Sequence, residues 1–141
     1  MPRLLIIDDD ADLVQILTKA LEVSGYEVHS APEPSQGMAL ARKVKPDLII
    51  LDYHMPGTSG AHLFESFRRN QSTRSTPILF MSGEATAEEI RAEIAEDAAS
   101  RFLSKPARIA EVRSIIEELL AKSAVTRSAS PRSQPPSAPS A

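Results

Sequence analysis

The chain has 141 residues, of which 42% are hydrophobic and 25% are charged, so its size and composition suit one globular domain with a core of its own. Its 16 Lys and Arg against 19 Asp and Glu give a net charge of −3, which provides no excess of positive charge for binding a nucleic-acid backbone. Cysteine is absent and the longest apolar runs have four residues, which excludes disulfide scaffolds, thiolate metal sites and membrane spans, and we expect a cytoplasmic protein without a secretory signal.

The first half of the chain alternates short apolar runs with helical patterns. Leu4–Ile7 is a continuous apolar run that predicts a buried strand. A helical stripe follows, with apolar residues at Leu13, Ile16, Leu17, Ala20 and Leu21. The next predicted elements are a strand over Tyr26–Ala31, a helix over Ser35–Val44 that ends before Pro46, and a strand over Asp47–Leu51.

The second half repeats this alternation after a loop that contains Pro56, Gly57 and Gly60. The predicted elements are a helix marked by Leu63, Phe64 and Phe67, a strand over Ile78–Met81, a helix over Ala85–Ala98, a strand over Phe102–Leu103 and a helix over Ala107–Lys122. From Thr126 onward Ser, Pro and Ala occupy 12 of 16 positions. We therefore predict one domain over residues 1–123 and a disordered Ser/Pro/Ala-rich tail or linker over residues 124–141.

Five strands and five helices in alternation define the predicted fold class. Apolar strands without in–out alternation are typical of parallel sheets that are covered on both faces. We therefore predict an α/β fold of the flavodoxin-like type, in which a doubly wound five-stranded parallel sheet and five helices form a three-layer sandwich. In such folds ligands bind at the carboxyl ends of the strands, so the residues that follow each strand are the candidates for function.

Polar residues follow four of the five predicted strands. They are Asp8, Asp9 and Asp10 after the first strand, Asp52 after the third, Ser82 after the fourth and Lys105 after the fifth. Each alone has an ordinary explanation, and Asp10 in particular suits a helix N-cap. Together they predict phosphoryl transfer, because carboxylates bind Mg²⁺, one carboxylate can attack phosphorus, and a lysine and a hydroxyl can pair with phosphoryl oxygens. The chain has no GxxxxGK[ST] loop, so its sequence does not support nucleotide binding.

These residues resemble the receiver domain of two-component response regulators. The matching segments are IIDDD, LIILDYHMPGTSG, LFMSG and RFLSKP, and the resemblance covers about residues 2–123. It implies that Asp52 is the phosphoacceptor. It also implies a Mg²⁺ site in which Asp9 binds the ion directly, Asp8 binds it through water, and Asp52 and the backbone carbonyl of His54 complete the protein's share.

The resemblance implies roles for three further residues. Ser82 would be the switch hydroxyl, Lys105 the lysine that pairs with the phosphoryl group, and Phe102 the switch aromatic. The Lys105–Pro106 peptide is expected to be cis. His54 and Glu84, each two residues past a site residue, are expected to flank the mouth of the site and to set the lifetime of the phosphoryl group.

The implied function is a phosphorelay signalling switch. A histidine kinase or phosphotransfer protein would phosphorylate Asp52, and the chain would catalyse only its own phosphorylation and dephosphorylation. Since the predicted elements end with the fifth helix, we expect a stand-alone receiver that acts on a downstream protein rather than on nucleic acid or a membrane, although the tail also suits a linker of a longer protein. A homodimer would use the fourth helix, fifth strand and fifth helix. The alternatives are a degenerate receiver that only binds a partner and an aspartate-nucleophile phosphatase of the haloacid-dehalogenase type.

Overall fold

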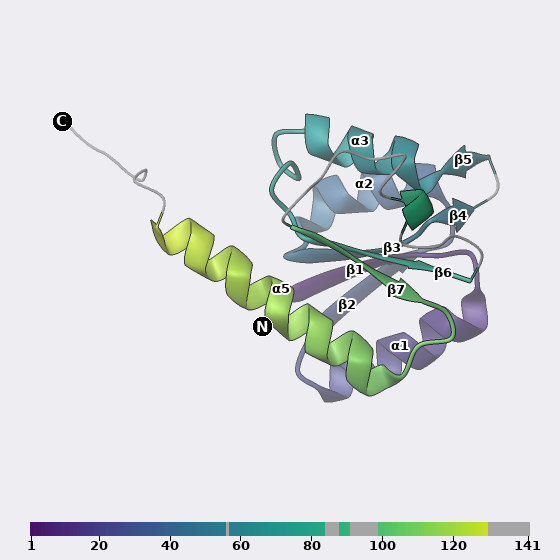
Figure 1. Ribbon diagram of the computed structural model, residues 1–141, viewed down its shortest axis with the longest axis horizontal. Coiled ribbons are helices and arrows are strands. Elements are labelled where there is room, and N and C mark those ends of the chain that lie inside the picture. The colour runs from purple at the N-terminus through teal and green to yellow at the C-terminus, as the bar shows by residue number, and fades with distance from the viewer. Residues whose placement is uncertain (56, 84–87, 91–98, 130–141) are drawn as a thin grey trace.

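A computed structural model describes residues 1–55, 57–83, 88–90 and 99–129, and in it a parallel sheet lies between two layers of helices (Figure 1). The sheet consists of β1 (Arg3–Ile7), β2 (Glu27–Ala31), β3 (Leu48–Asp52), β6 (Ile78–Ser82) and β7 (Ser100–Ser104). The helices with described bounds are α1 (Ala11–Val23), α2 (Pro34–Val44), α3 (Gly60–Arg69) and α5 (Ile109–Ala129). The predicted α/β fold with a five-stranded parallel sheet is therefore confirmed. Most of the predicted helix over Ala85–Ala98 lies outside the described residues.

The order of the strands places the candidate site. The sheet runs β2-β1-β3-β6-β7, and all its neighbouring strands are parallel. The chain passes from β1 to β2 at one edge and then returns to the other side of β1 for β3, so its winding direction reverses between β1 and β3. Ile7 pairs with Leu51 across this boundary, and the next residues are Asp8 and Asp52. The register thus sets these two carboxylates side by side at the point where doubly wound sheets bind their ligands.

The central strands bury both of their faces, as their apolar runs predicted. On one side the core packs under α2 and α3, and on the other side under α1 and α5 (Figure 1). Successive residues alternate between the two cores, so that the first includes Leu5, Ile7, Ile49 and Leu51 and the second includes Leu4, Ile6, Leu48 and Ile50. None of these eight residues is more than 1% exposed. Two cores on opposite faces hold the sheet rigidly, which fixes the ends of its strands.

Two helices differ from their predictions. In α1 the core residues are Leu17 and Leu21, while Ile16 is 57% exposed and lies on the flank of the predicted stripe. Helix α5 continues to Ala129, past the predicted end at Lys122 and into the segment assigned to the tail. Residues 130–141 of that tail lie outside the described residues. Within the described part of the chain, no helix combines the length and the hydropathy that crossing a bilayer requires.

Between β3 and α3 the chain forms a small hairpin where the sequence predicted only a loop. The two-residue strands β4 (His54–Met55) and β5 (Thr58–Ser59) pair in antiparallel register. The Gly60 N–H donates to the Tyr53 carbonyl over 2.8 Å, which closes the base of the hairpin. Tyr53 is 2% exposed, and its ring packs edge-on against Phe80 with centroids 5.5 Å apart. These contacts anchor the backbone directly after Asp52.

Gly60→Ala is expected to lower the free energy of unfolding by about 1–3 kcal/mol, the usual cost of overpacking. A Cβ at this position would lie 2.8 Å from the Tyr53 Cα, so backbone has to move. Urea denaturation followed by circular dichroism measures the change. Gly83→Ala is the matched control, because a Cβ there would meet its nearest described atom, the Lys105 Cβ, at an ordinary 3.8 Å. Equal stability of the two variants would contradict the tight contact at Gly60.

Candidate functional site

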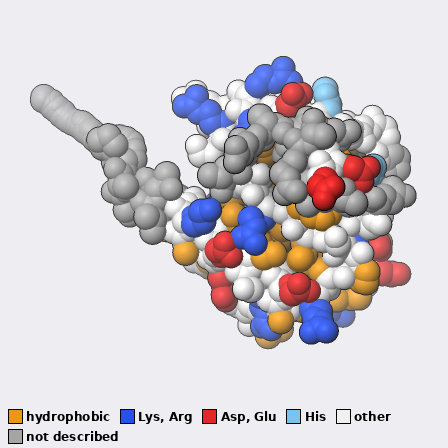
Figure 2. Space-filling view, in the orientation of Figure 1, with side chains coloured by type: hydrophobic (Ala, Val, Ile, Leu, Met, Phe, Trp, Pro, Cys, Tyr) orange, Lys and Arg blue, Asp and Glu red, His pale blue; other side chains and the backbone are white. Residues whose placement is uncertain are grey.

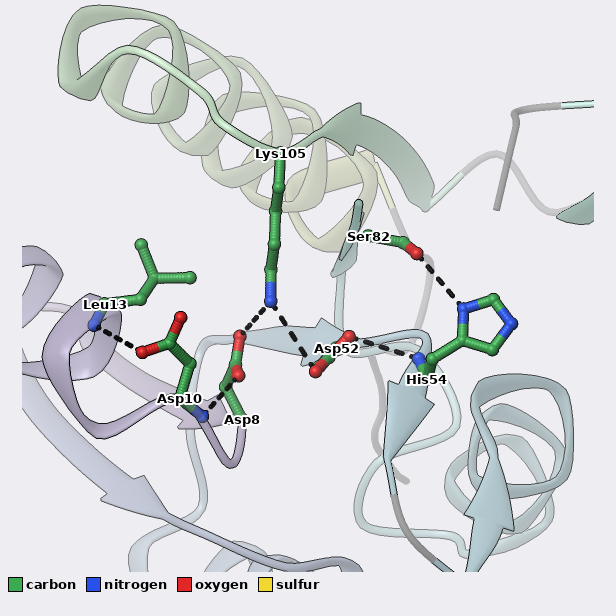
Figure 3. A network of polar contacts seen from close by, with 7 residues as sticks. All are labelled: Asp8, Asp10, Leu13, Asp52, His54, Ser82 and Lys105. Carbon is green, nitrogen blue, oxygen red and sulfur yellow. Dashed lines mark hydrogen bonds and ion pairs between the residues drawn. The ribbon is translucent and has the colours of Figure 1, made fainter. Parts of the chain in front are cut away.

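The residues that follow the strands meet at one edge of the sheet (Figure 3). Asp8 and Asp9 follow β1, Asp52 ends β3, Ser82 ends β6 and Lys105 follows β7. Because these strands are parallel neighbours, their carboxyl ends lie at the same edge. The structure thus brings together side chains that the sequence placed only at the ends of separate elements.

The acidic cluster consists of Asp8, Asp9 and Asp52. Each offers a carboxylate oxygen that lies within 4.8 Å of the other two. Asp8 is 3% exposed and Asp52 is 5% exposed, whereas Asp9 faces solvent. Hard oxygen ligands at this spacing fit a divalent cation such as Mg²⁺. The cluster is therefore a candidate metal site with one open side.

Asp10, the third aspartate of the run, has the structural role that the sequence favoured for it. Its carboxylate accepts a hydrogen bond from the Leu13 N–H over 3.2 Å and caps the N-terminus of α1. Its own N–H donates to the Asp8 Oδ1 over 2.9 Å. Asp10 therefore fixes the carboxylate of Asp8 through its backbone, and among the described residues its side chain stays out of the acidic cluster.

Lys105 is the cation of the site. Its Nζ lies 2.9 Å from the Asp8 Oδ2 and 3.6 Å from the Asp52 Oδ2. Its backbone N–H donates to the Ser82 carbonyl over 2.9 Å, and the Lys105–Pro106 peptide is cis, as predicted. Burial acts to lower the pKa of Lys105, but the hydrogen bond to Asp8 and the two carboxylate charges outweigh it, and the pKa is raised. The ammonium group therefore stays charged between the two carboxylates.

Crowding of like charges alters the titration of Asp52. Burial, followed by the negative charge of Asp8, raises the pKa of Asp52 from 3.8 to about 6. The His54 N–H, which donates to the Asp52 Oδ1 over 3.1 Å, and the Lys105 charge oppose this rise without cancelling it. Without a metal ion, the ionised Asp52 carboxylate therefore lowers the stability of the folded chain near neutral pH. A bound cation would offset this loss.

Ser82 and His54 form a contact that the sequence did not reveal. Ser82 is 2% exposed, and its Oγ lies 3.2 Å from the Nδ1 of the exposed His54 ring. The sequence had assigned the His54 carbonyl to the metal site and its side chain to the mouth of the site, but not to a contact with Ser82. The contact depends on the pairing of β4 with β5, and strands of two residues are too short to be recognised from a sequence pattern. Phe102, the expected switch aromatic, is half-buried against the core under α2 and α3, and Glu84 lies outside the described residues.

The chain is similar to proteins of one family. The family model described as the response regulator receiver domain matches residues 4–117. The DNA-binding dual master transcriptional regulator RpaA of Synechocystis is 32% identical over 120 residues, which cover 85% of this chain and 49% of that protein. The phosphate regulon transcriptional regulatory protein PhoB of Pseudomonas aeruginosa is 35% identical over 103 residues, or 73% of this chain and 44% of that protein. The chain thus spans about half the length of these curated relatives.

Solved structures agree in fold. The chemotaxis protein CheY4 of Vibrio cholerae matches with a TM-score of 0.75 at 28% sequence identity. The match covers 84% of this chain and 98% of that one. The described elements therefore have the fold of that chemotaxis protein over nearly all of its chain.

Proposed function

The chain belongs to the receiver domains of two-component response regulators, and from this premise we propose that it is a phosphorelay switch that carries its phosphoryl group on Asp52. The observation that supports the proposal most is the place of this carboxylate. It lies 3.6 Å from the Lys105 ammonium and within 4.8 Å of the Asp8 and Asp9 carboxylates. A nucleophile, a cation and a set of metal ligands therefore converge on one point.

Asp52 would act as the nucleophile. One of its carboxylate oxygens forms a bond to phosphorus while the bond from phosphorus to the leaving group breaks and its electron pair leaves with that group. The leaving group is a histidine imidazole when a kinase or phosphotransfer protein is the donor, and acetate when acetyl phosphate is the donor. Since the pKa of Asp52 is about 6, most of the carboxylate is ionised near neutral pH.

Lys105 and Ser82 would bind the oxygens of the transferred group. Lys105 offers an ammonium that pairs with a phosphoryl oxygen, and Ser82 offers a hydroxyl proton. Asp8, Asp9, Asp52 and the His54 backbone carbonyl would hold Mg²⁺. When bound, this ion supplies positive charge that stabilises the phosphoryl oxygens in the transition state.

Mg²⁺ is expected to raise the melting temperature of the chain by several degrees. A ligand that binds only the folded state adds about 2.7 kcal/mol at a hundredfold excess over its Kd. Thermal unfolding with and without millimolar MgCl₂ measures the shift, and NaCl of equal ionic strength controls for screening. Asp9→Asn should reduce the shift, since Asp9 belongs to the acidic cluster. An unchanged midpoint in the parent chain would count against a metal site.

The partners follow from this chemistry. A histidine kinase or phosphotransfer protein would donate the phosphoryl group, in the cytoplasm, and a downstream protein would read the phosphorylated state. We expect no activity beyond phosphorylation and dephosphorylation of the chain itself, and no direct contact with nucleic acid or a membrane.

The face proposed for output and for a homodimer includes β7, α5 and the predicted fourth helix. On its described part, hydrophobic side chains lie among charged ones (Figure 2), and Arg101 of β7 forms an ion pair with Glu118 of α5. Ile115 and Leu120, two apolar residues of α5, are half-buried against the core under α1 and α5. The dimer therefore has to rest on a mixed surface rather than on that pair.

Incubation with acetyl phosphate and Mg²⁺ tests the proposed function. A single acid-stable, base-labile phosphoryl group that Asp52→Asn abolishes supports the switch. Continuous release of inorganic phosphate without accumulation of a phosphorylated chain would favour the phosphatase. No adduct and no turnover would favour the degenerate binding module.

A further inference from the structure

We propose that the His54 side chain is a positioning residue that holds the Ser82 hydroxyl in the unphosphorylated chain and has to release it when Asp52 is phosphorylated. The inference rests on the proposed function and adds a residue to it. Removal of the imidazole would free the hydroxyl and favour the phosphorylated arrangement. His54 would thus oppose activation of this chain through a single side-chain contact.

The contact joins two elements across the mouth of the site. The His54 Nδ1 lies 3.2 Å from the Ser82 Oγ, and the two residues are 28 positions apart in the sequence. Figure 3 shows the Ser82 side chain directed toward the imidazole ring, while the Asp52 carboxylate receives the contacts from Lys105 and from the His54 N–H. His54 therefore contacts the phosphoacceptor with its backbone and the switch hydroxyl with its ring.

Contacts of the backbone and of the ring position His54. His54 pairs with Ser59 in the hairpin, and its N–H is bonded to the Asp52 Oδ1. Its ring packs edge-on against the buried Tyr53 ring, with centroids 5.4 Å apart. Because the hairpin fixes the His54 backbone, a shift of the Ser82 hydroxyl toward Asp52 increases its distance from Nδ1. Movement of the hydroxyl therefore breaks the contact.

The two partners of Ser82 compete for one proton. A serine hydroxyl has a single hydrogen to donate. Phosphoryl oxygens only accept, so Ser82 has to donate this hydrogen to reach the phosphoryl group. In the imidazole tautomer that carries its proton on Nε2, Nδ1 is also an acceptor. We assign this tautomer to His54, with the Ser82 hydroxyl donating to Nδ1.

Beryllofluoride, which mimics a phosphoryl group on a carboxylate, provides the test. Its affinity in the presence of Mg²⁺ is measured by calorimetry for the parent chain and for His54→Ala. Loss of one intramolecular hydrogen bond that opposes binding should tighten the affinity by about 2- to 12-fold. His54→Asn, whose amide oxygen can replace Nδ1 as the acceptor, should return the affinity toward that of the parent. His62→Ala, an exposed histidine of α3, is the matched control and should leave the affinity unchanged.

The Ser82→Ala background separates the contact from other effects of the ring. Without the hydroxyl, His54→Ala should no longer change the affinity for beryllofluoride. Nitrogen NMR of the imidazole gives a second reading, in which the parent should show a protonated Nε2, and Ser82→Ala should shift the Nδ1 resonance in the absence of any phosphoryl mimic.

Two results would overturn the inference. One is an affinity that is unchanged or weaker in His54→Ala, and the other is an effect of equal size in the Ser82→Ala background. Failure of the proposed function looks different, since the parent chain itself would then neither bind beryllofluoride nor accept a phosphoryl group.

Discussion

Asp52→Asn is expected to abolish phosphorylation by acetyl phosphate and, in the metal-free chain, to raise the free energy of unfolding at neutral pH. The first effect follows because an amide is not a nucleophile toward phosphorus. The second follows because burial and the negative charge of Asp8 raise the pKa of Asp52 to about 6. The variant removes one of the crowded charges and keeps nearly the same volume.

The gain in stability of Asp52→Asn over the parent should increase with pH. Below the ordinary pKa of 3.8 the Asp52 carboxyl is protonated in both the folded and the unfolded chain, so no charge is removed by the substitution. Between 3.8 and about 6 the folded chain retains a proton that the unfolded chain has released, so the stability of the parent falls as the pH rises. Above pH 6 the full cost is present. The gain in the variant should therefore grow from pH 4 to pH 6 and then level off.

The plateau should amount to roughly 1–2 kcal/mol. One pKa unit corresponds to about 1.4 kcal/mol, and solvent at the open side of the site reduces the full value. Urea denaturation in EDTA between pH 4 and pH 8 measures it. Glu65→Gln is the control, because it neutralises an exposed carboxylate of α3 and should shift stability little at any pH. If Asp52→Asn is less stable than the parent at pH 8, burial and the charge of Asp8 do not destabilise the ionised Asp52 carboxylate.

In contrast to Asp52→Asn, Lys105→Met is expected to lower the free energy of unfolding. Like Asp52→Asn, it should impair phosphorylation. Lys105 is the cation between Asp8 and Asp52, at 2.9 Å and 3.6 Å from their carboxylates. Methionine keeps most of the length of the side chain but leaves these buried carboxylates without their partner. The free energy of unfolding in EDTA at pH 8 should fall by about 1–3 kcal/mol, less than for a fully buried pair because the lysine side chain is 20% exposed.

Phosphorylation of Lys105→Met by acetyl phosphate should slow by about 100-fold or more, the usual cost of removing one group that stabilises transition-state charge. In the Asp52→Asn background the loss of stability should shrink, since one of the two carboxylates is already neutral. Lys19→Met removes an exposed lysine of α1 and serves as the control. Phosphorylation at the parental rate in Lys105→Met would remove the lysine from the proposed mechanism.

Local patterns predicted much of the fold. Leu4–Ile7 and Leu48–Leu51 predicted buried strands, since a run without polar residues has to be covered on both faces. Asp10 predicted the N-terminus of α1, which its carboxylate caps. The failures lie where the pattern was short or ambiguous. A hairpin of two-residue strands has no period, and Ile16 lies at the edge of a stripe, where burial depends on how the helix packs against the sheet.

The sequence by itself determined which residue types follow each strand, and so the kind of chemistry at the candidate site. The tertiary structure alone decided how close those residues lie. The strand order β2-β1-β3 sets Asp8 beside Asp52, and burial beside that second charge raises the pKa of Asp52. The contact between His54 and Ser82 likewise exists only because the hairpin turns the imidazole toward the end of β6. Residue identity is local information, whereas distance, desolvation and hydrogen-bond partners depend on how segments far apart in the chain pack together.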